Sequence, residues 1–164
     1  MIPYSSPTND IGDLAYVNNE IWVTAARSGN IARYDLSGSL IDVFNSPSGE
    51  GASAQVGNEV WIASGLAGTI SRHDFSGAFL GNYSNPTGFG AADVITVGND
   101  VWIGDTNTGL IARFDFSGSF IDTFSSPNGD IGKMATIVPI PPAADLFGSG
   151  LIGLAGIAKR RVQS

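Results

Sequence analysis

The chain of 164 residues contains no cysteine and a single histidine, His73. The absence of cysteine excludes disulfides, thiolate zinc sites and thiol catalysis, and the single histidine leaves one candidate for the commonest general base of enzymes. Strong helix formers are also rare before Pro139, whereas the chain holds 22 glycines and 8 prolines. We therefore predict an all-β fold that is rich in turns.

Basic residues are few in most of the chain. Residues 1–138 hold fourteen acidic and five basic residues, a net charge of −9, whereas residues 139–164 hold one acidic and three basic residues, a net charge of +2. Because phosphate binding needs a basic face, the acidic body argues against nucleic acid as a partner. Residues 1–10 show no basic stretch followed by an apolar one, so no secretory signal is visible there.

The sequence repeats itself about every 40 residues, and this repeat is its dominant feature. One recurring segment is centred on three tryptophans that are 39 and 41 residues apart: Trp22, Trp61 and Trp102. A second recurring segment has the pattern Ile-x-Arg-x-Asp-x-Ser-Gly and begins at Ile31, Ile70 and Ile111. Within the unit from Asp13 to Phe44, alternating apolar residues predict strands over 13–17, 19–26, 30–36 and 39–44.

The Asp-x-Ser-Gly between the third and fourth strands of each unit favours a type I turn. Aspartate at the first turn position accepts backbone N–H groups, and glycine at the fourth tolerates a positive φ. Four short antiparallel strands in a unit of this length are typical of a β-propeller blade. We therefore predict about three blades over residues 11–137, with the tryptophans packed between neighbouring blades and not stacked on a ligand.

These units resemble the repeats of NHL-like and streptogramin-lyase-like propellers. The resemblance is carried by strands such as Gly-Asn-Glu-Val-Trp-Ile (57–62) and by the Ile-x-Arg-x-Asp-x-Ser-Gly hairpins, and it covers about residues 11–125. Complete propellers have four to eight blades, and residues 1–10 have the sequence of the end of an upstream blade. We therefore expect a fragment of a larger propeller, extended upstream by further blades and a signal peptide, whose open sheet edge favours self-association.

The histidine is the candidate catalytic base of the repeats. His73 occupies the position that Tyr34 and Phe114 hold in the other two units. We interpret it as a packing residue, because an aromatic ring is the common feature of this position. The repeats then contain no convergent catalytic set, so we predict that the chain is not an enzyme and uses no cofactor.

Three other motifs suggest ligands, but each favours a structural role. The Arg-x-Asp of each hairpin favours a local ion pair or contacts with the next hairpin over an anion site. The polar segment 105–107 favours a solvated loop, because the Asp-x-Asp-x-Asp-Gly spacing of a calcium site is missing. Residues 148–153 match Gly-x-Gly-x-x-Gly, yet only eleven residues follow, too few for a dinucleotide-binding unit. We therefore predict no metal site.

The last 27 residues, 138–164, combine a proline motif, a nearly uncharged apolar segment and a basic cluster. As a helix, residues 142–158 would reach roughly 25 Å, slightly less than the roughly 30 Å hydrocarbon core of a bilayer. The basic cluster would stay in the cytoplasm, so we predict a C-terminal transmembrane helix with the propeller on the other side. The three parts are Val138, Pro139, Ile140, Pro141 and Pro142; then Leu146, Phe147, Gly148, Ser149, Gly150, Leu151, Ile152, Gly153, Leu154, Ala155 and Gly156; then Lys159, Arg160 and Arg161.

This tripartite order resembles the PEP-CTERM sorting signal of Gram-negative bacteria, with Ile140 where the eponymous motif has glutamate. The resemblance implies export, transient anchoring in the inner membrane, and processing near the proline motif by exosortase, a cysteine transpeptidase-like membrane enzyme. The expected partners are exosortase, the inner membrane and extracellular polysaccharide, and the expected destination is the cell surface or the exopolysaccharide matrix of a biofilm.

Two alternatives stay open. One is a propeller-type lyase or lactonase whose catalytic blades lie upstream, and the other is a permanently anchored scaffold that is never cleaved.

Overall fold

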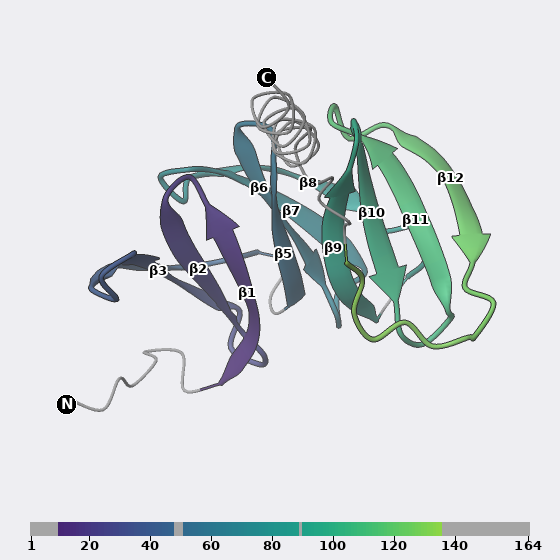
Figure 1. The fold of residues 1–164 in the computed structure, drawn as a ribbon, viewed down its shortest axis with the longest axis horizontal. Coiled ribbons are helices and arrows are strands. Elements are labelled where there is room, and N and C mark those ends of the chain that lie inside the picture. The colour runs from purple at the N-terminus through teal and green to yellow at the C-terminus, as the bar shows by residue number, and fades with distance from the viewer. Residues whose placement is uncertain (1–9, 48–50, 89, 136–164) are drawn as a thin grey trace, which may run out of the picture.

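The computed structural model describes residues 10–47, 51–88 and 90–135, which form strands and turns without a helix. The strands make three four-stranded antiparallel sheets, each with its strands in chain order (Figure 1). The all-β prediction and the prediction of four strands in each repeat are thus confirmed.

Blade 1 contains β1 (Ile11–Val17), β2 (Glu20–Ala25), β3 (Asn30–Asp35) and β4 (Leu40–Asn45). Blade 2 contains β5 (Gly51–Val56), β6 (Glu59–Ser64), β7 (Thr69–Asp74) and β8 (Phe79–Ser84). Blade 3 contains β9 (Ala91–Val97), β10 (Asp100–Asp105), β11 (Leu110–Asp115) and β12 (Phe120–Ser125).

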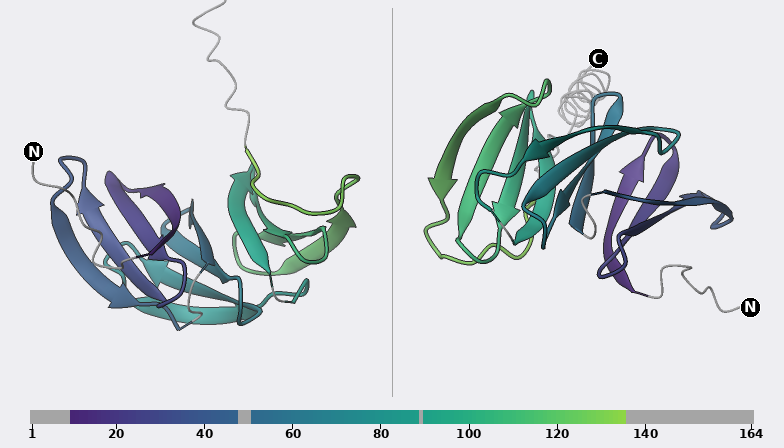
Figure 2. Two further views of the ribbon diagram at one scale, coloured as in Figure 1. Left: turned by 90° about the horizontal axis from the view of Figure 1, so that it is seen from below. Right: turned by 180° about the vertical axis from the view of Figure 1, so that it is seen from behind.

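The three blades stand side by side in an arc (Figure 2). The first strand of each blade lies on the inner side of this arc, and β5 contacts both β1 and β9. The fourth strands, β4, β8 and β12, form the outer edges, and most of their residues are exposed. The inner strands of different blades therefore come together, and any site near the axis of the arc is built from them.

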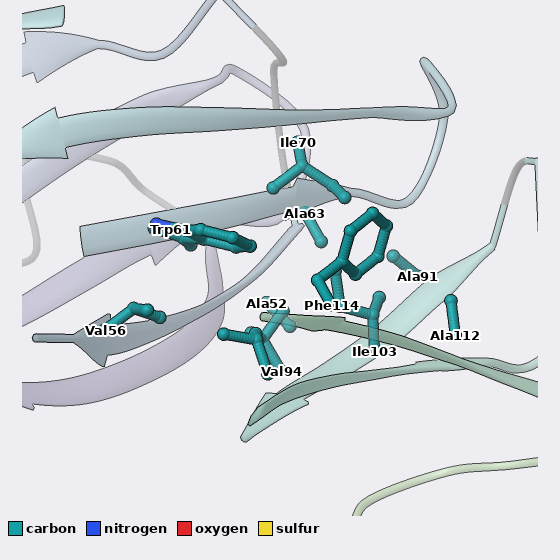
Figure 3. Packing of buried hydrophobic residues seen from close by; sticks show 11 residues of the cluster. Ala52, Val56, Trp61, Ala63, Ile70, Ala91, Val94, Ile103, Ala112 and Phe114 are labelled. Atoms are coloured by element: carbon teal, nitrogen blue, oxygen red, sulfur yellow. The ribbon is translucent and has the colours of Figure 1, made fainter. Parts of the chain in front are cut away.

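Alternating side chains give each sheet two apolar faces, and neighbouring blades pack through these faces. In Figure 3, Trp61 of blade 2 points toward Phe114 of blade 3, and their ring centroids are 6.3 Å apart. Trp22 and Trp61 are fully buried in clusters that include residues of the next blade, which confirms packing between blades for these two tryptophans. Trp102 is only partly buried, because its blade stands at the end of the arc.

The predicted turns between the third and fourth strands are also confirmed. Asp35 Oδ1 accepts the N–H groups of Ser37 at 2.8 Å and of Ser39 at 2.9 Å, while Gly38 has a φ of 87°. The hydroxyl of Ser37, followed by the N–H of Ser39, lowers the pKa of the Asp35 carboxyl. Asp74 and Asp115 have the same hydrogen bonds and the same direction of pKa shift. The positive φ explains why glycine ends the motif.

Both ends of the chain contain predictions that lie outside the described residues. These are the end of an upstream blade at residues 1–10, of which only residue 10 is described, and the sorting signal at residues 138–164. Over the ranges that the structure describes, no helix is long and apolar enough to cross a bilayer.

Candidate functional site

A shallow pocket lies where the inner strands of all three blades begin. Its volume is about 200 Å³, and most of its walls are glycine and alanine, such as Gly12, Ala52 and Ala91. Two charged residues, Asp13 and Lys133, complete the lining. We take this pocket as the candidate site because every blade contributes to it and because charged side chains meet there.

Lys133 joins blade 1 to blade 3 across this pocket. Its ammonium group donates to Asp13 Oδ1 at 2.9 Å and lies 3.5 Å from Asp93 Oδ1. The side chains of the two aspartates are only 13% and 9% exposed, whereas that of Lys133 is 57% exposed. Burial lowers the pKa of Lys133, but the hydrogen bond to Asp13 and the charges of both aspartates outweigh burial and raise it overall. The two carboxylates therefore stabilise the charged form of Lys133.

The segment that carries Lys133 returns from the outer strand β12 to the inner strand β9 (Figure 1). The Met134 N–H donates to Asp93 Oδ2 at 2.6 Å, as the Ser53 N–H donates to Asp13 Oδ2 at 2.8 Å. Ser53 belongs to the inner strand of the blade that follows Asp13. Met134 therefore takes the place that an inner-strand residue of a further blade would have.

Residues 131–135, which we call the docked segment, are held by further contacts. Ile131 is 6% exposed, and the Thr106 hydroxyl donates to its carbonyl at 2.9 Å. Gly104 allows the close approach, because a Cβ there would lie 2.7 Å from Ile131 Cγ2. Our sequence reasoning missed this segment. The signal was present, since Asp-Ile-Gly at residues 10–12 recurs at residues 130–132, three repeat lengths later.

The side chains at the pocket offer hydrogen bonds and charges to a ligand. The Ser53 hydroxyl lies 3.4 Å from Asp13 Oδ2, and no histidine is available nearby to activate it, since the single histidine lies in β7. Within the described part of the chain, no group of three or more His, Cys, Asp or Glu side chains is arranged to hold a metal ion. The arrangement can bind polar groups of a ligand, and it holds the blades together.

His73 is buried between blades, as predicted for a packing residue. Its ring lies 5.3 Å from that of Phe44 and 5.8 Å from that of Phe79. Nδ1 is 3.1 Å from the Gly77 carbonyl, which can only accept, so Nδ1 carries the proton and Nε2 accepts from the Ser71 hydroxyl at 3.3 Å. Burial lowers the pKa of His73 and keeps the ring neutral.

The arginine of each Arg-x-Asp motif pairs with an acid of the preceding strand. Arg33 Nε and Nη2 donate to the two oxygens of Glu20 at 2.9 and 3.0 Å, and Nη1 donates to the Ser76 carbonyl of blade 2 at 2.8 Å. The Trp22 indole donates to the same carboxylate at 3.2 Å. The predicted local pairing and contact with the next hairpin are confirmed for Arg33, but its acidic partner is Glu20 and not Asp35.

Blade 3 departs from this pattern because Asp100 stands where blades 1 and 2 have glutamate. In blade 2, Glu59 accepts hydrogen bonds from Arg72 Nε, Arg72 Nη2 and the Trp61 indole. In blade 3, only Arg113 Nη2 reaches Asp100, at 2.9 Å. Two buried donors, Arg113 Nε and Trp102 Nε1, have no hydrogen-bond partner among the described residues. They are the atoms that the longer glutamate serves in the other blades.

The segment 105–107 is only partly a solvated loop. Thr106 and Asn107 are exposed, as predicted, but Asp105 is fully buried, so the prediction is wrong for that residue. Asp105 Oδ1 accepts the N–H groups of Asn107 and Thr108, both at 2.8 Å. The Ser64 hydroxyl caps the corresponding turn of blade 2. Burial at this position thus follows from the need to satisfy the N–H groups of the turn.

Solved structures similar to this chain identify its fold. BamB from Moraxella catarrhalis is 22% identical with a TM-score of 0.61, over 80% of this chain and 42% of that chain. Streptogramin B lyase is 20% identical with a TM-score of 0.60, over 76% of this chain and 43% of that chain. The fold is that of β-propeller blades. The computationally designed Ika4 protein is 19% identical with a TM-score of 0.60, over 78% of this chain and 80% of that chain.

The likeness to these structures shows the fold alone, because the identities are low. The chain spans about two fifths of the length of the BamB and streptogramin B lyase chains. No protein-family model and no curated protein sequence matches the chain. The predicted repeats and propeller blades are therefore confirmed, while every predicted sorting residue, from Val138 to Arg161, lies outside the described residues.

Proposed function

We propose that this chain is an exported, non-catalytic propeller protein that exosortase sorts to the cell surface or the exopolysaccharide matrix. The observation that carries the proposal is the order of proline motif, apolar segment and basic cluster within residues 138–164. Before processing, the apolar segment anchors the chain in the inner membrane and the propeller faces away from the cytoplasm. The propeller then presents a rigid, acidic body at the surface, with extracellular polysaccharide as its proposed ligand.

Two features support a non-catalytic role for the described blades. The imidazole of His73 is buried between blades with both nitrogens hydrogen-bonded, so it cannot exchange protons with a ligand in the pocket. Lys133 is paired with carboxylates, and the raised pKa keeps it protonated near neutral pH. The pocket therefore supplies contacts for binding and not an acid–base pair.

The sorting test fuses residues 138–164 to a secreted reporter and expresses it in isogenic hosts with and without exosortase. We expect a shortened reporter in the medium only when exosortase is present, and retention in the membrane fraction when it is absent. A control fusion replaces the residues from Lys159 to Arg161 with serine and should lose its processing. Identical retention and length in both hosts would refute the sorting role.

The similarity to streptogramin B lyase favours a second candidate, a propeller-type lyase or lactonase. A histidine-to-alanine variant of virginiamycin B lyase from Staphylococcus aureus, solved with quinupristin, is described as catalytically inactive. The single histidine of this chain is buried, which argues against the same chemistry within these blades. Incubation of the full chain with quinupristin, followed by mass spectrometry, tests this candidate. We expect intact quinupristin, and a cleaved product would establish the lyase.

A further inference from the structure

The last contacts that fix the chain to the propeller lie at Lys133 and Met134, five and four residues before the proposed processing motif. Lys133 contacts aspartates of β1 and β9, the Met134 N–H binds Asp93, and Ile131 is buried. The Thr106 hydroxyl, in the loop after β10, adds a hydrogen bond to the Ile131 carbonyl. The docked segment therefore has partners on three separate elements.

This attachment leaves a short tether before the motif. Three residues separate Met134, the last described residue with a hydrogen bond to the blades, from Val138. An extended chain covers at most about 3.5 Å per residue, so this tether can span at most about 14 Å. A folded domain of this size has a radius of gyration of about 14 Å, so the tether is no longer than the body to which it is attached.

In the proposed function the processing enzyme lies in the membrane, so the tether length decides how closely the propeller and the enzyme must approach. Processing breaks one peptide bond near the motif. The carbonyl carbon exchanges its bond to nitrogen for a bond to the enzyme's cysteine sulfur, the amine leaves with a proton, and water or an acceptor amine then releases the acyl group. The scissile carbonyl must reach that sulfur, and a bulky body close to the motif opposes this approach.

Changing the charge of Lys133 should weaken the attachment of the docked segment more than any other single substitution in it. Its ammonium group is the counter-charge for both Asp13 and Asp93, whose side chains are largely buried. The rest of the pocket wall is glycine and alanine, with no further charge. A glutamate at position 133 would place three carboxylates together and release the segment.

We propose that the docked segment restrains exosortase processing and that Lys133 is the positioning residue that holds it. The proposal rests on the proposed function, because it concerns the processing step. While residues 131–135 are docked, the motif is held close to the propeller and processing is slow. Release of the contacts from Ile131 to Met134 adds four residues of chain, up to about 14 Å of reach, and processing becomes faster.

The test measures processing of the full-length chain by pulse–chase in a host that contains exosortase. We expect Lys133→Glu to be processed roughly threefold faster or more, because effective concentration rises steeply when a tether first becomes long enough. Lys133→Arg retains the charge and should be processed like the wild type. Asp93→Ala removes the acceptor of both Lys133 and Met134 and should behave like Lys133→Glu.

A second variant separates tether length from every other effect of the lysine. Five Gly/Ser residues inserted after Ala135 lengthen the tether while the docked segment keeps all its contacts. We expect this insertion to accelerate processing as Lys133→Glu does. Limited proteolysis of the purified full chain in detergent provides an independent measurement, because residues 131–135 should be cut faster in Lys133→Glu than in Lys133→Arg.

The outcomes separate this proposal from the proposed function. Unprocessed wild-type chain would refute sorting and with it the restraint, whatever the proteolysis shows. Processed wild-type chain with no acceleration in Lys133→Glu or in the insertion variant would refute the restraint alone. Acceleration in Lys133→Glu without acceleration in the insertion variant would also overturn the proposal, because tether length would then not be the cause.

Discussion

The substitution Asp100→Glu should stabilise the protein, because it restores a carboxylate that serves three donors in blades 1 and 2. In blade 3, Trp102 Nε1 and Arg113 Nε are buried, and no described residue accepts a hydrogen bond from them. The equivalent position already accommodates glutamate in both other blades, at Glu20 and Glu59, so the added methylene has a known place.

The expected gain follows from the two hydrogen bonds. A typical hydrogen bond contributes about 1 kcal/mol net, and a buried unsatisfied donor costs about 1–3 kcal/mol. The side chains of Arg113 and Asp100 are 29% and 27% exposed, so part of this gain is lost to solvent. We expect Asp100→Glu to raise the free energy of unfolding by about 1–2 kcal/mol, or Tm by roughly 3–8 °C.

The assay is urea unfolding of the full chain in detergent, followed by tryptophan fluorescence. The reciprocal substitution Glu59→Asp creates the blade 3 arrangement in blade 2 and should lower stability by a similar amount. Asp100→Asn removes charge without adding reach and should also be destabilising. A loss in Glu59→Asp with no gain in Asp100→Glu would refute the reasoning, because it would mean that water already satisfies the two donors.

Three further predictions concern pH, turn geometry and the pocket. Burial lowers the pKa of His73 below its usual 6.5, so the stability that the neutral ring contributes is complete above pH 6.5 and falls as the pH decreases toward the folded-state pKa. On acidification from pH 7 to pH 5, the free energy of unfolding should therefore fall less in His73→Phe than in the wild type. Gly38→Ala should destabilise the protein by about 1–2 kcal/mol, because the glycine has a positive φ. Gly77→Ala should destabilise it by more, because a Cβ there would also lie 2.7 Å from the Phe44 ring. Equal losses of unfolding free energy in chemical unfolding would contradict this. Lys133→Met should cost about 0.5–1 kcal/mol at low salt and less at 1 M salt, and a salt-independent loss would exclude an ionic cause.

The parts of the fold that depend on nearby residues were predictable from the sequence. Alternating apolar residues place the strands, and Asp-x-Ser-Gly places the turns, because both signals act over a few residues. The partner of Arg33 was not predictable in this way, since Glu20 lies on the neighbouring strand and is identified only by the strand register. Asp105 was misjudged because its environment depends on the N–H groups of the following turn.

The candidate pocket was missed for a related reason. Lys133 stands at the repeat position that holds aspartate at residues 13 and 93. A lysine at this position forms ion pairs with those two aspartates. A search for identical motifs does not find a position whose charge changes sign. The Asp-Ile-Gly at residues 130–132 shows that the repeat continues past β12, and this continuation would have placed Lys133 beside the inner strands.

Asp100→Glu also decides whether the docked segment opens locally or only when the whole protein unfolds. Local opening breaks the contacts of residues 131–135 and leaves the hydrogen bonds of blade 3 intact, so its free energy does not depend on global stability. Global unfolding breaks both sets. If the restraint on processing is local, Asp100→Glu raises the free energy of unfolding but leaves the processing rate unchanged. If processing slows in proportion to the added stability, the motif becomes accessible only through global unfolding. The docked segment would then be released only together with the rest of the protein, and not by local opening.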